Sequence, residues 1–166
     1  MSPARAPEPA VASDWTPVDP FPALGRRRSF ISGEPTGDRL RLAYFRRPGD
    51  PILYAKAWFG PGAEGPPDIA HGGAIFGVLD EVMGGCCWLS GLHVVAARLC
   101  TDFKHVVPLG LDTTCEGWIE EVNGRKVTAR ARMYDDAGAV LAESDGLFIV
   151  LEAAQFAEMK NRLEQR

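Results

Sequence analysis

A histidine, two glycines and an aspartate stand at a spacing that suits acid–base chemistry on a polarised carbonyl. His71, Gly72 and Gly73 open an apolar segment, and Asp80 follows nine residues after the histidine. Apolar residues of this segment recur at the i, i+3, i+4, i+7 spacing of one helix face, at Ile75, Val78, Leu79, Val82, Met83 and Cys86. The stretch 69–90 therefore predicts an α-helix that begins near the glycine pair.

The opposite side of this helix carries unusually few side chains. At about 100° per residue, Asp80 falls on the same side as three glycines, Gly73, Gly77 and Gly84. A glycine inside a helix costs about 0.5 to 1 kcal/mol relative to alanine, so these positions imply close packing or a ligand. The free amides at the helix start can bind an anion or a developing oxyanion.

One helix cannot bring its start and Asp80 to the same reacting atom. The nine residues from His71 to Asp80 span roughly 13 Å, at about 1.5 Å per residue. A shared substrate would need two antiparallel copies of the helix, which predicts a dimer with composite sites. The alternative is a solvated Asp80 on a helix whose glycines only permit packing. Glu81, about 100° further round the helix, is expected to be solvated or paired with a basic residue.

The motif HGGAIFGVLDEVMG, with the later segments ARLCTDFKHVVPLG and ESDGLFIVL, resembles the hotdog-fold acyl-CoA thioesterases. The similar subgroup is that of the phenylacetate-pathway and 4-hydroxybenzoyl-CoA enzymes, and the resemblance covers about residues 40–151. It implies an antiparallel sheet around one central helix, in subunits that pair edge to edge and commonly join as tetramers. It also implies that Asp80 is the catalytic carboxylate, and that an amide at Gly72 or Gly73 of the facing subunit polarises the thioester carbonyl.

The same resemblance implies a small-to-medium acyl-CoA substrate, hydrolysed to the free acid and coenzyme A without a further cofactor. Asp80 would act as general base or as nucleophile, and the sequence does not separate the two routes. His71 is a candidate substrate contact, although a histidine there can equally satisfy a backbone group. Phe76 and Trp88 are candidates for the acyl pocket, but aromatic residues on a helix face are more often core.

Coenzyme A carries phosphates, which basic side chains bind. The preferred candidates are Lys104, Arg125 and Lys126. Two positions depart from the family, because Gly65 stands where relatives often carry a side-chain amide and Ala96 where they often carry serine or threonine. Asp80 would then lack polar helpers. This departure keeps open a second reading, a non-catalytic acyl-thioester binding protein of the same fold.

The composition is typical of a soluble globular protein of one domain, with 166 residues, 46% apolar and 24% charged. A net charge of −4 argues against a nucleic-acid surface. The four cysteines form no CxxC pair and the three histidines no metal-ligand spacing, so no metal site is expected and the adjacent Cys86 and Cys87 should be buried. Without a signal peptide or an evident membrane span, we expect a cytoplasmic protein with no membrane partner.

The rest of the chain predicts an α+β fold with about six antiparallel strands. Period-two alternation marks them at 40–45, 52–59, 94–105, 113–121, 126–135 and 140–151. In the strand after the helix, Val95, Leu99 and Phe103 are expected on one face. The Gly- and Pro-rich stretch 60–70 is expected to be a loop, with Asp68 as a turn residue.

The N-terminal residues are rich in proline, and the first dozen are expected to be disordered. Trp15, Phe21 and Leu24 should dock the segment 15–24 on the domain, and Arg26–Arg28 should form a solvated charge cluster. The predicted division is an extension at 1–38, a hotdog domain at 39–152 and a C-terminal helix at 153–166.

Overall fold

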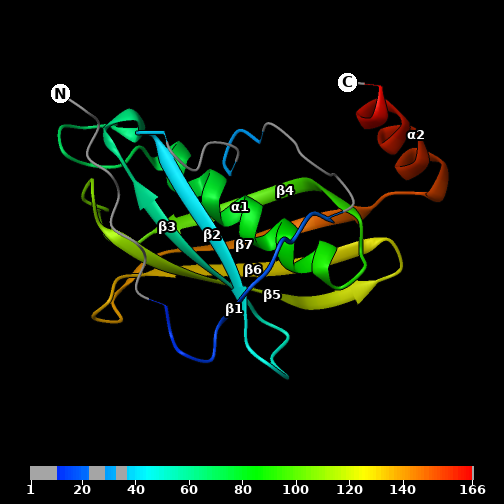
Figure 1. Cartoon of the computed structure of the whole chain (residues 1–166), viewed down its shortest axis with the longest axis horizontal. Coiled ribbons are helices and arrows are strands. Elements are labelled where there is room, and N and C mark those ends of the chain that lie inside the picture. Colours follow the sequence, from blue (N-terminus) through cyan, green and yellow to red (C-terminus); the bar gives the residue numbers. More distant parts are fainter. Residues whose placement is uncertain (1–10, 23–28, 33–36, 166) are drawn as a thin grey trace.

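The computed structural model describes residues 11–22, 29–32 and 37–165 of the chain. Within these ranges seven strands form one antiparallel sheet, and the long helix α1 (Gly72–Leu89) packs across it, as Figure 1 shows. The strands are β1 (Thr16–Pro17), β2 (Leu40–Arg46), β3 (Leu53–Phe59), β4 (Val94–Phe103), β5 (Asp112–Asn123), β6 (Lys126–Tyr134) and β7 (Val140–Val150). Their order in the sheet is β1-β2-β3-β5-β6-β7-β4, so β4 is an edge strand. The sheet has one strand more than predicted, because β1 pairs with the end of β2.

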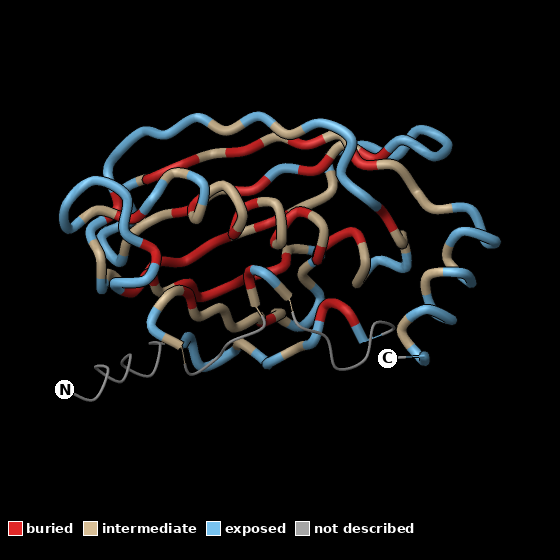
Figure 2. The backbone as a smooth tube through the Cα atoms, turned by 90° about the horizontal axis from the view of Figure 1, so that it is seen from above, coloured by how far each residue is buried: buried red, intermediate tan, exposed pale blue. Residues whose placement is uncertain are grey.

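The apolar stripe of α1 forms the centre of the core, as predicted. Its six residues are between 0% and 3% exposed and pack on the inner face of the sheet: Ile75, Val78, Leu79, Val82, Met83 and Cys86. Figure 2 shows the buried residues gathered in the middle of the fold and the exposed ones around its rim. By length and mean hydropathy alone α1 is also apolar enough to cross a membrane, although the sequence pattern predicted no membrane span. In this fold the sheet covers that stripe.

Helix α1 lies so close to β5 that Gly117 has no room for a side chain. A Cβ at Gly117 would lie 2.6 Å from Cγ1 and 2.9 Å from the carbonyl oxygen of Val82. Because the second atom belongs to the helix backbone, relief would require the helix to move.

We therefore expect Gly117→Ala to lower the free energy of unfolding by about 1 to 3 kcal/mol, the usual cost of overpacking a core. Urea unfolding followed by circular dichroism would measure this change. Gly72→Ala is the matched control, since its Cβ would make only an ordinary contact at 3.5 Å. Equal stability of the Gly117→Ala and wild-type proteins would contradict the close approach.

The edge strand β4 departs from regular alternation. Its register with β7 shifts between Ala96 and Arg98, which leaves Ala97 as a bulge. Directly paired residues share a face of the sheet. The residues of β4 that pair with buried residues of β7 therefore face the helix, and so do the other residues on the same side of β4. These helix-facing residues are Val94, Ala96, Leu99, Thr101 and Phe103. Val95 instead points to the other face and is 49% exposed, so its predicted grouping with Leu99 and Phe103 is wrong.

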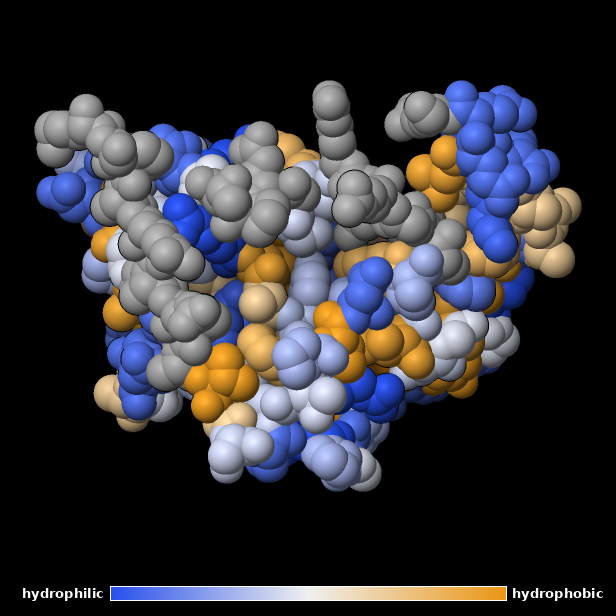
Figure 3. Space-filling model, in the orientation of Figure 1, coloured by the Kyte–Doolittle hydropathy of each residue, from blue (hydrophilic) through white to orange (hydrophobic). Residues whose placement is uncertain are grey.

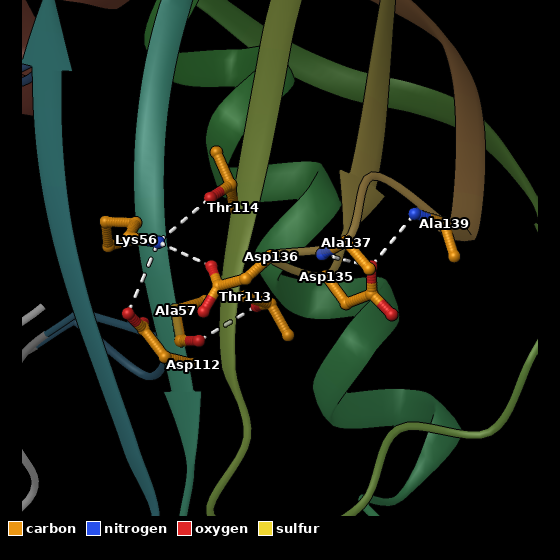
Figure 4. Close-up of polar contacts among 9 residues, drawn as sticks. All are labelled: Lys56, Ala57, Asp112, Thr113, Thr114, Asp135, Asp136, Ala137 and Ala139. Atoms are coloured by element: carbon orange, nitrogen blue, oxygen red, sulfur yellow. Dashed lines mark hydrogen bonds and ion pairs between the residues drawn. The ribbon is translucent and has the colours of Figure 1, made fainter. Parts of the chain in front are cut away.

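A buried lysine joins three parts of the sheet on its outer face. Lys56 on β3 donates to the Thr114 hydroxyl at 3.0 Å and pairs with Asp112 at 3.2 Å and Asp136 at 3.5 Å, as Figure 4 shows. These partners come from the start of β5 and from the turn between β6 and β7. Because the two carboxylates compensate the positive charge of Lys56, this cluster has a structural role and holds the strands together.

The described N-terminal residues dock on the domain. The Trp15 ring centroid lies 4.7 Å from that of Tyr54, and Phe21 is 8% exposed. The predictions for residues 1–10, Leu24 and Arg26–Arg28 lie outside the described residues. The division into extension, domain and C-terminal helix stays a prediction.

The C-terminal helix α2 (Ala153–Glu164) projects from one end of the sheet (Figure 1). Its start is fixed by the Arg125–Glu152 ion pair and by the His93 ring, which stacks on Phe156 with a centroid distance of 3.9 Å. The stretch 60–70 contains a short 3-10 turn, η2 (Pro61–Ala63). On the face shown in Figure 3, hydrophobic and hydrophilic residues are intermixed, as is usual for a protein surface.

Candidate functional site

His71 caps the start of α1. Its backbone is extended, with φ −61° and ψ 134°, and its Nδ1 accepts a hydrogen bond from the Gly73 N–H at 2.9 Å. Its carbonyl oxygen accepts from the amides of Ala74 and Ile75 at 2.8 and 3.2 Å. The structure therefore shows the backbone contact that the sequence allowed for His71, and a contact of His71 with the substrate stays a prediction.

The amides of the two glycines are not equivalent. The Gly73 N–H is bonded to His71, whereas the Gly72 N–H has no acceptor among the described residues. Gly72 lies beside the edge strand, because a Cβ on it would stand 3.5 Å from the Phe103 ring. An amide without an acceptor at the positive end of a helix can stabilise an oxyanion. Gly72, rather than Gly73, offers this donor.

Asp80 lies about two turns further along α1, with a partly buried side chain. Its carboxylate makes no hydrogen bond or ion pair with the described residues. Burial raises the pKa of Asp80 above its usual value, and the negative charge of the adjacent Glu81 raises it further. A half-buried carboxylate with a raised pKa and no structural partner is a candidate for acid–base chemistry.

Glu81 has a different environment from its neighbour. Its carboxylate accepts hydrogen bonds from the hydroxyls of Ser32 at 2.7 Å, Ser29 at 3.2 Å and Tyr44 at 3.3 Å. The sequence interpretation did not anticipate these hydroxyls. They tie residues 29–32 to the helix, one residue away from Asp80, and indicate a structural role for Glu81.

At one position on the glycine-rich face of α1, packing explains why the side chain is missing. A Cβ on Gly77 would lie 2.4 Å from Cδ1 of Ile31, so the N-terminal segment fills this notch. Gly84, one turn after Asp80, is more open, and its nearest neighbour would be Phe148 Cε1 at 3.9 Å. Phe148 pairs with Ala96 on β4. Phe148 therefore links the inner face of β4 around Ala96 to Gly84, which lies on the same helix face as Asp80.

The two departures from the family pattern have different surroundings. A Cβ on Gly65 would lie 2.9 Å from the Cα of His71, so a side-chain amide there would require the loop to move. The loop is fixed at this point, because the His71 amide donates to the Ala63 carbonyl at 2.8 Å. Asp68 is a turn residue as predicted, with a φ of 61°. Ala96 presents only a methyl group to the helix side.

The aromatic candidates for the acyl pocket have different roles. Trp88 donates its indole N–H to the Val94 carbonyl at 3.1 Å and packs edge-on against Phe21 and His93. It therefore serves packing at the end of α1. Phe76 is partly buried on the helix and remains a candidate for the pocket.

The structure does not bring the three basic candidates together within one chain. Lys104 follows β4 at the end near the start of α1 and lies 3.5 Å from Asp102. Arg125 lies in the turn between β5 and β6, and Lys126 begins β6 and pairs with Ile149. Because Phe103 pairs with Ala142, at the far end of β7, the two groups lie at opposite ends of the sheet.

Three of the four cysteines, Cys86, Cys87 and Cys115, are buried, in agreement with the prediction for the adjacent pair. Cys100 is exposed on the outer face of β4. Within the described ranges, no group of three or more His, Cys, Asp or Glu side chains could hold a metal ion.

Comparison with known proteins places these residues in a family context. Residues 68–142 match the family model of the thioesterase superfamily. The chain is 38% identical over 95 residues to acyl-coenzyme A thioesterase THEM4 of Xenopus laevis, covering 55% of this chain and 42% of that one. It is 33% identical over 131 residues to THEM4 of Bos taurus, covering 78% and 54%. The chain thus spans about half the length of these curated relatives.

Solved structures share the fold. A thioesterase superfamily protein matches with a TM-score of 0.67 and 26% identity, covering 85% of this chain and 68% of that one. The PaaI protein of the E. coli phenylacetic acid degradation operon matches with a TM-score of 0.60 at 14% identity, covering 68% and 80%. A Streptococcus mutans protein bound to acetyl CoA matches at 0.59 and 15%, covering 61% and 82%. The sheet and helix that hold Gly72 and Asp80 form a hotdog fold like that of these structures, and residues 68–142 are similar to the thioesterase superfamily.

Proposed function

We propose that this protein is an acyl-coenzyme A thioesterase whose active sites are shared between two subunits. One observation carries the proposal: a partly buried Asp80 without a structural partner lies on the same helix whose first amide, at Gly72, has no acceptor among the described residues. The names of the THEM4 relatives and the acetyl CoA bound to the Streptococcus mutans protein support this class of substrate.

The two groups supply what thioester hydrolysis requires. Water adds to the carbonyl carbon, the oxygen becomes an oxyanion, and the carbon–sulfur bond then breaks to give the carboxylic acid and the thiol of coenzyme A. The Gly72 N–H stabilises the oxyanion. Asp80 takes the proton of the attacking water as general base, or adds to the carbonyl as a nucleophile and is released by water. Both routes need the ionised form of Asp80.

The site is shared because one chain cannot complete it. Gly72 and Asp80 are about 12 Å apart along the helix. Strand β4 lies at the edge of the sheet with most of its residues exposed. Antiparallel pairing of two copies of β4 continues the sheet and brings the two α1 helices together, so that Gly72 of one subunit approaches Asp80 of the other. A pair of such dimers would form the tetramer that the resemblance implies.

The same pairing also brings the basic candidates closer. Antiparallel strands place the end of one β4 beside the beginning of the other. Lys104 of one subunit thereby approaches the end of the partner that carries Arg125 and Lys126. We assign these three side chains to the phosphates of coenzyme A, with His71 and Phe76 nearer the acyl group. The proposal includes a small-to-medium acyl group, no cofactor beyond the coenzyme A of the substrate, a cytoplasmic location, and no nucleic-acid or membrane partner.

Release of free coenzyme A from a panel of aromatic, short-chain and medium-chain acyl-CoAs tests the proposal, with a thiol reagent as the readout. Turnover of at least one class is the expected result and identifies the acyl group. The alternative is an acyl-thioester binding protein, favoured by the lack of a side chain at Gly65 and of a hydroxyl at Ala96. Binding of an acyl-CoA in calorimetry without turnover would establish that alternative.

A further inference from the structure

We propose that Thr101 of one subunit is a positioning residue for Asp80 of the other. The proposal rests on the dimeric thioesterase described above and adds to it a residue from the edge strand. Within its own chain Asp80 has no hydrogen-bond donor among the described residues. The partner subunit's Thr101 supplies one.

Thr101 belongs to a hydroxyl pair on the helix-facing side of the sheet. Its Oγ1 lies 2.5 Å from Oγ of Ser144, the residue opposite it on β7. Ser144 is 6% exposed, whereas Thr101 stands at the open edge and is partly exposed. When Ser144 donates to Thr101, the proton of the Thr101 hydroxyl is left for an acceptor beyond the edge.

The bulge limits how β4 can pair with a second copy of itself. Opposed residues of adjacent strands must share a face, and a shift of one residue would reverse the faces. Several registers that are symmetric between the two copies meet this condition. Only the register in which Leu99 of one copy lies opposite Leu99 of the other pairs the strand over its whole length, from Val94 to Phe103. This register leaves both copies of Ala97 unopposed and sets Thr101 opposite Ala96.

Ala96 is linked through Phe148 to the part of α1 that carries Asp80. It pairs with Phe148, whose ring lies 3.9 Å from the Cβ position of Gly84, one helical turn from Asp80. A residue that faces Ala96 from the other subunit enters the same neighbourhood. The small Ala96 side chain leaves space there, so the partner subunit's Thr101 can direct its hydroxyl toward the carboxylate.

The carboxylate has few other polar neighbours. The inner faces of β4 and β7 bear no ionisable side chain next to this part of α1: their residues are Ala96, Leu99, Thr101, Ser144, Gly146 and Phe148. On the helix itself Glu81 is the one adjacent charge, and the nearby Ser29 and Ser32 are bonded to it. A donated hydroxyl would favour the ionised form of Asp80 and fix its orientation.

Mixed dimers test whether Thr101 acts across the interface. Thr101→Val should lower kcat/KM by about ten- to a hundredfold, the loss typical of a hydrogen bond to a charged group, while Thr101→Ser should retain most of it. Subunits carrying Asp80→Asn and Thr101→Val are then co-expressed with different tags. The purified mixed dimer contains one site with both Asp80 and Thr101 intact and should recover about half of the wild-type activity per dimer. Absence of recovery in a stable mixed dimer would overturn the proposal, because Thr101 would then act within its own chain.

Titration of Asp80 provides a readout that needs no turnover. Thr101→Val should raise the pKa of the Asp80 carboxyl, seen by NMR with ¹³C-labelled aspartate, and Ala96→Thr in the same background should partly reverse this shift. An unchanged pKa would overturn the proposal, as would a monomeric wild-type protein. If the wild type lacks turnover but the pKa still shifts, the contact stands and the thioesterase proposal fails.

Discussion

Replacement of Asp80 by asparagine is expected to lower kcat by about 10²- to 10⁴-fold, the usual contribution of a general base. The amide has nearly the same shape but cannot accept the proton of water or attack the thioester. Because the substitution removes an interaction of the transition state, KM should change little. Initial rates of thiol release on the preferred acyl-CoA would measure both constants, and a variant within a few fold of the wild type would exclude Asp80 as the reacting carboxylate.

The same variant should remain folded, which separates loss of chemistry from loss of structure. The raised pKa of Asp80 means that the folded state holds its proton more tightly than the unfolded state. Stability from this group is therefore lost as pH rises from its usual pKa through the raised one. At neutral pH the ionised Asp80 is a cost, so Asp80→Asn should unfold at an equal or higher urea concentration. In the wild type, activity should fall on the acid side as Asp80 becomes protonated.

Gly72→Pro is expected to lower kcat by about 10²- to 10³-fold, the loss seen when one oxyanion donor is removed. Gly72 is the first residue of α1, where proline is tolerated because its missing N–H has no partner in the helix. The extended backbone of His71 is compatible with a following proline. The substitution therefore removes the proposed donor with little disturbance of the fold.

Gly72→Ala is the control, because it keeps the N–H and adds only a methyl group 3.5 Å from the Phe103 ring. It should retain kcat within a few fold. Parallel assays of both variants, with circular dichroism to check the fold, distinguish the donor from the space around it. If alanine and proline cause the same loss, the contact with Phe103 matters and the amide does not.

The central helix could be predicted from the sequence because its pattern depends on local periodicity. All six residues of its apolar stripe are buried, and two glycines that lie between the predicted strands, Gly124 and Gly138, have the positive φ values of 57° and 83° that tight turns require. The strand positions were also largely recovered, since alternation depends on the same buried face. The separation of Gly72 and Asp80 along the helix likewise follows from the sequence alone.

Features set by contacts between distant segments could not be predicted. Gly77 makes room for Ile31. Glu81 accepts hydrogen bonds from the hydroxyls of three residues that lie between 37 and 52 positions away from it in the sequence. The bulge at Ala97 changes which side of β4 faces the helix, and period-two alternation contains no sign of it. The choice of Gly72 over Gly73 as donor depends on the ring orientation of His71, which no spacing reveals.

The bulge in β4 also has a consequence for which strands this edge accepts. An open edge can act as a template for any extended chain and so promotes aggregation. A bulge bends its strand and increases the local twist, so the row of free amides and carbonyls along β4 is not straight beyond Ala97. A flat foreign strand would therefore pair well with only one half of this edge. The irregularity thus protects the open edge against unspecific strand addition.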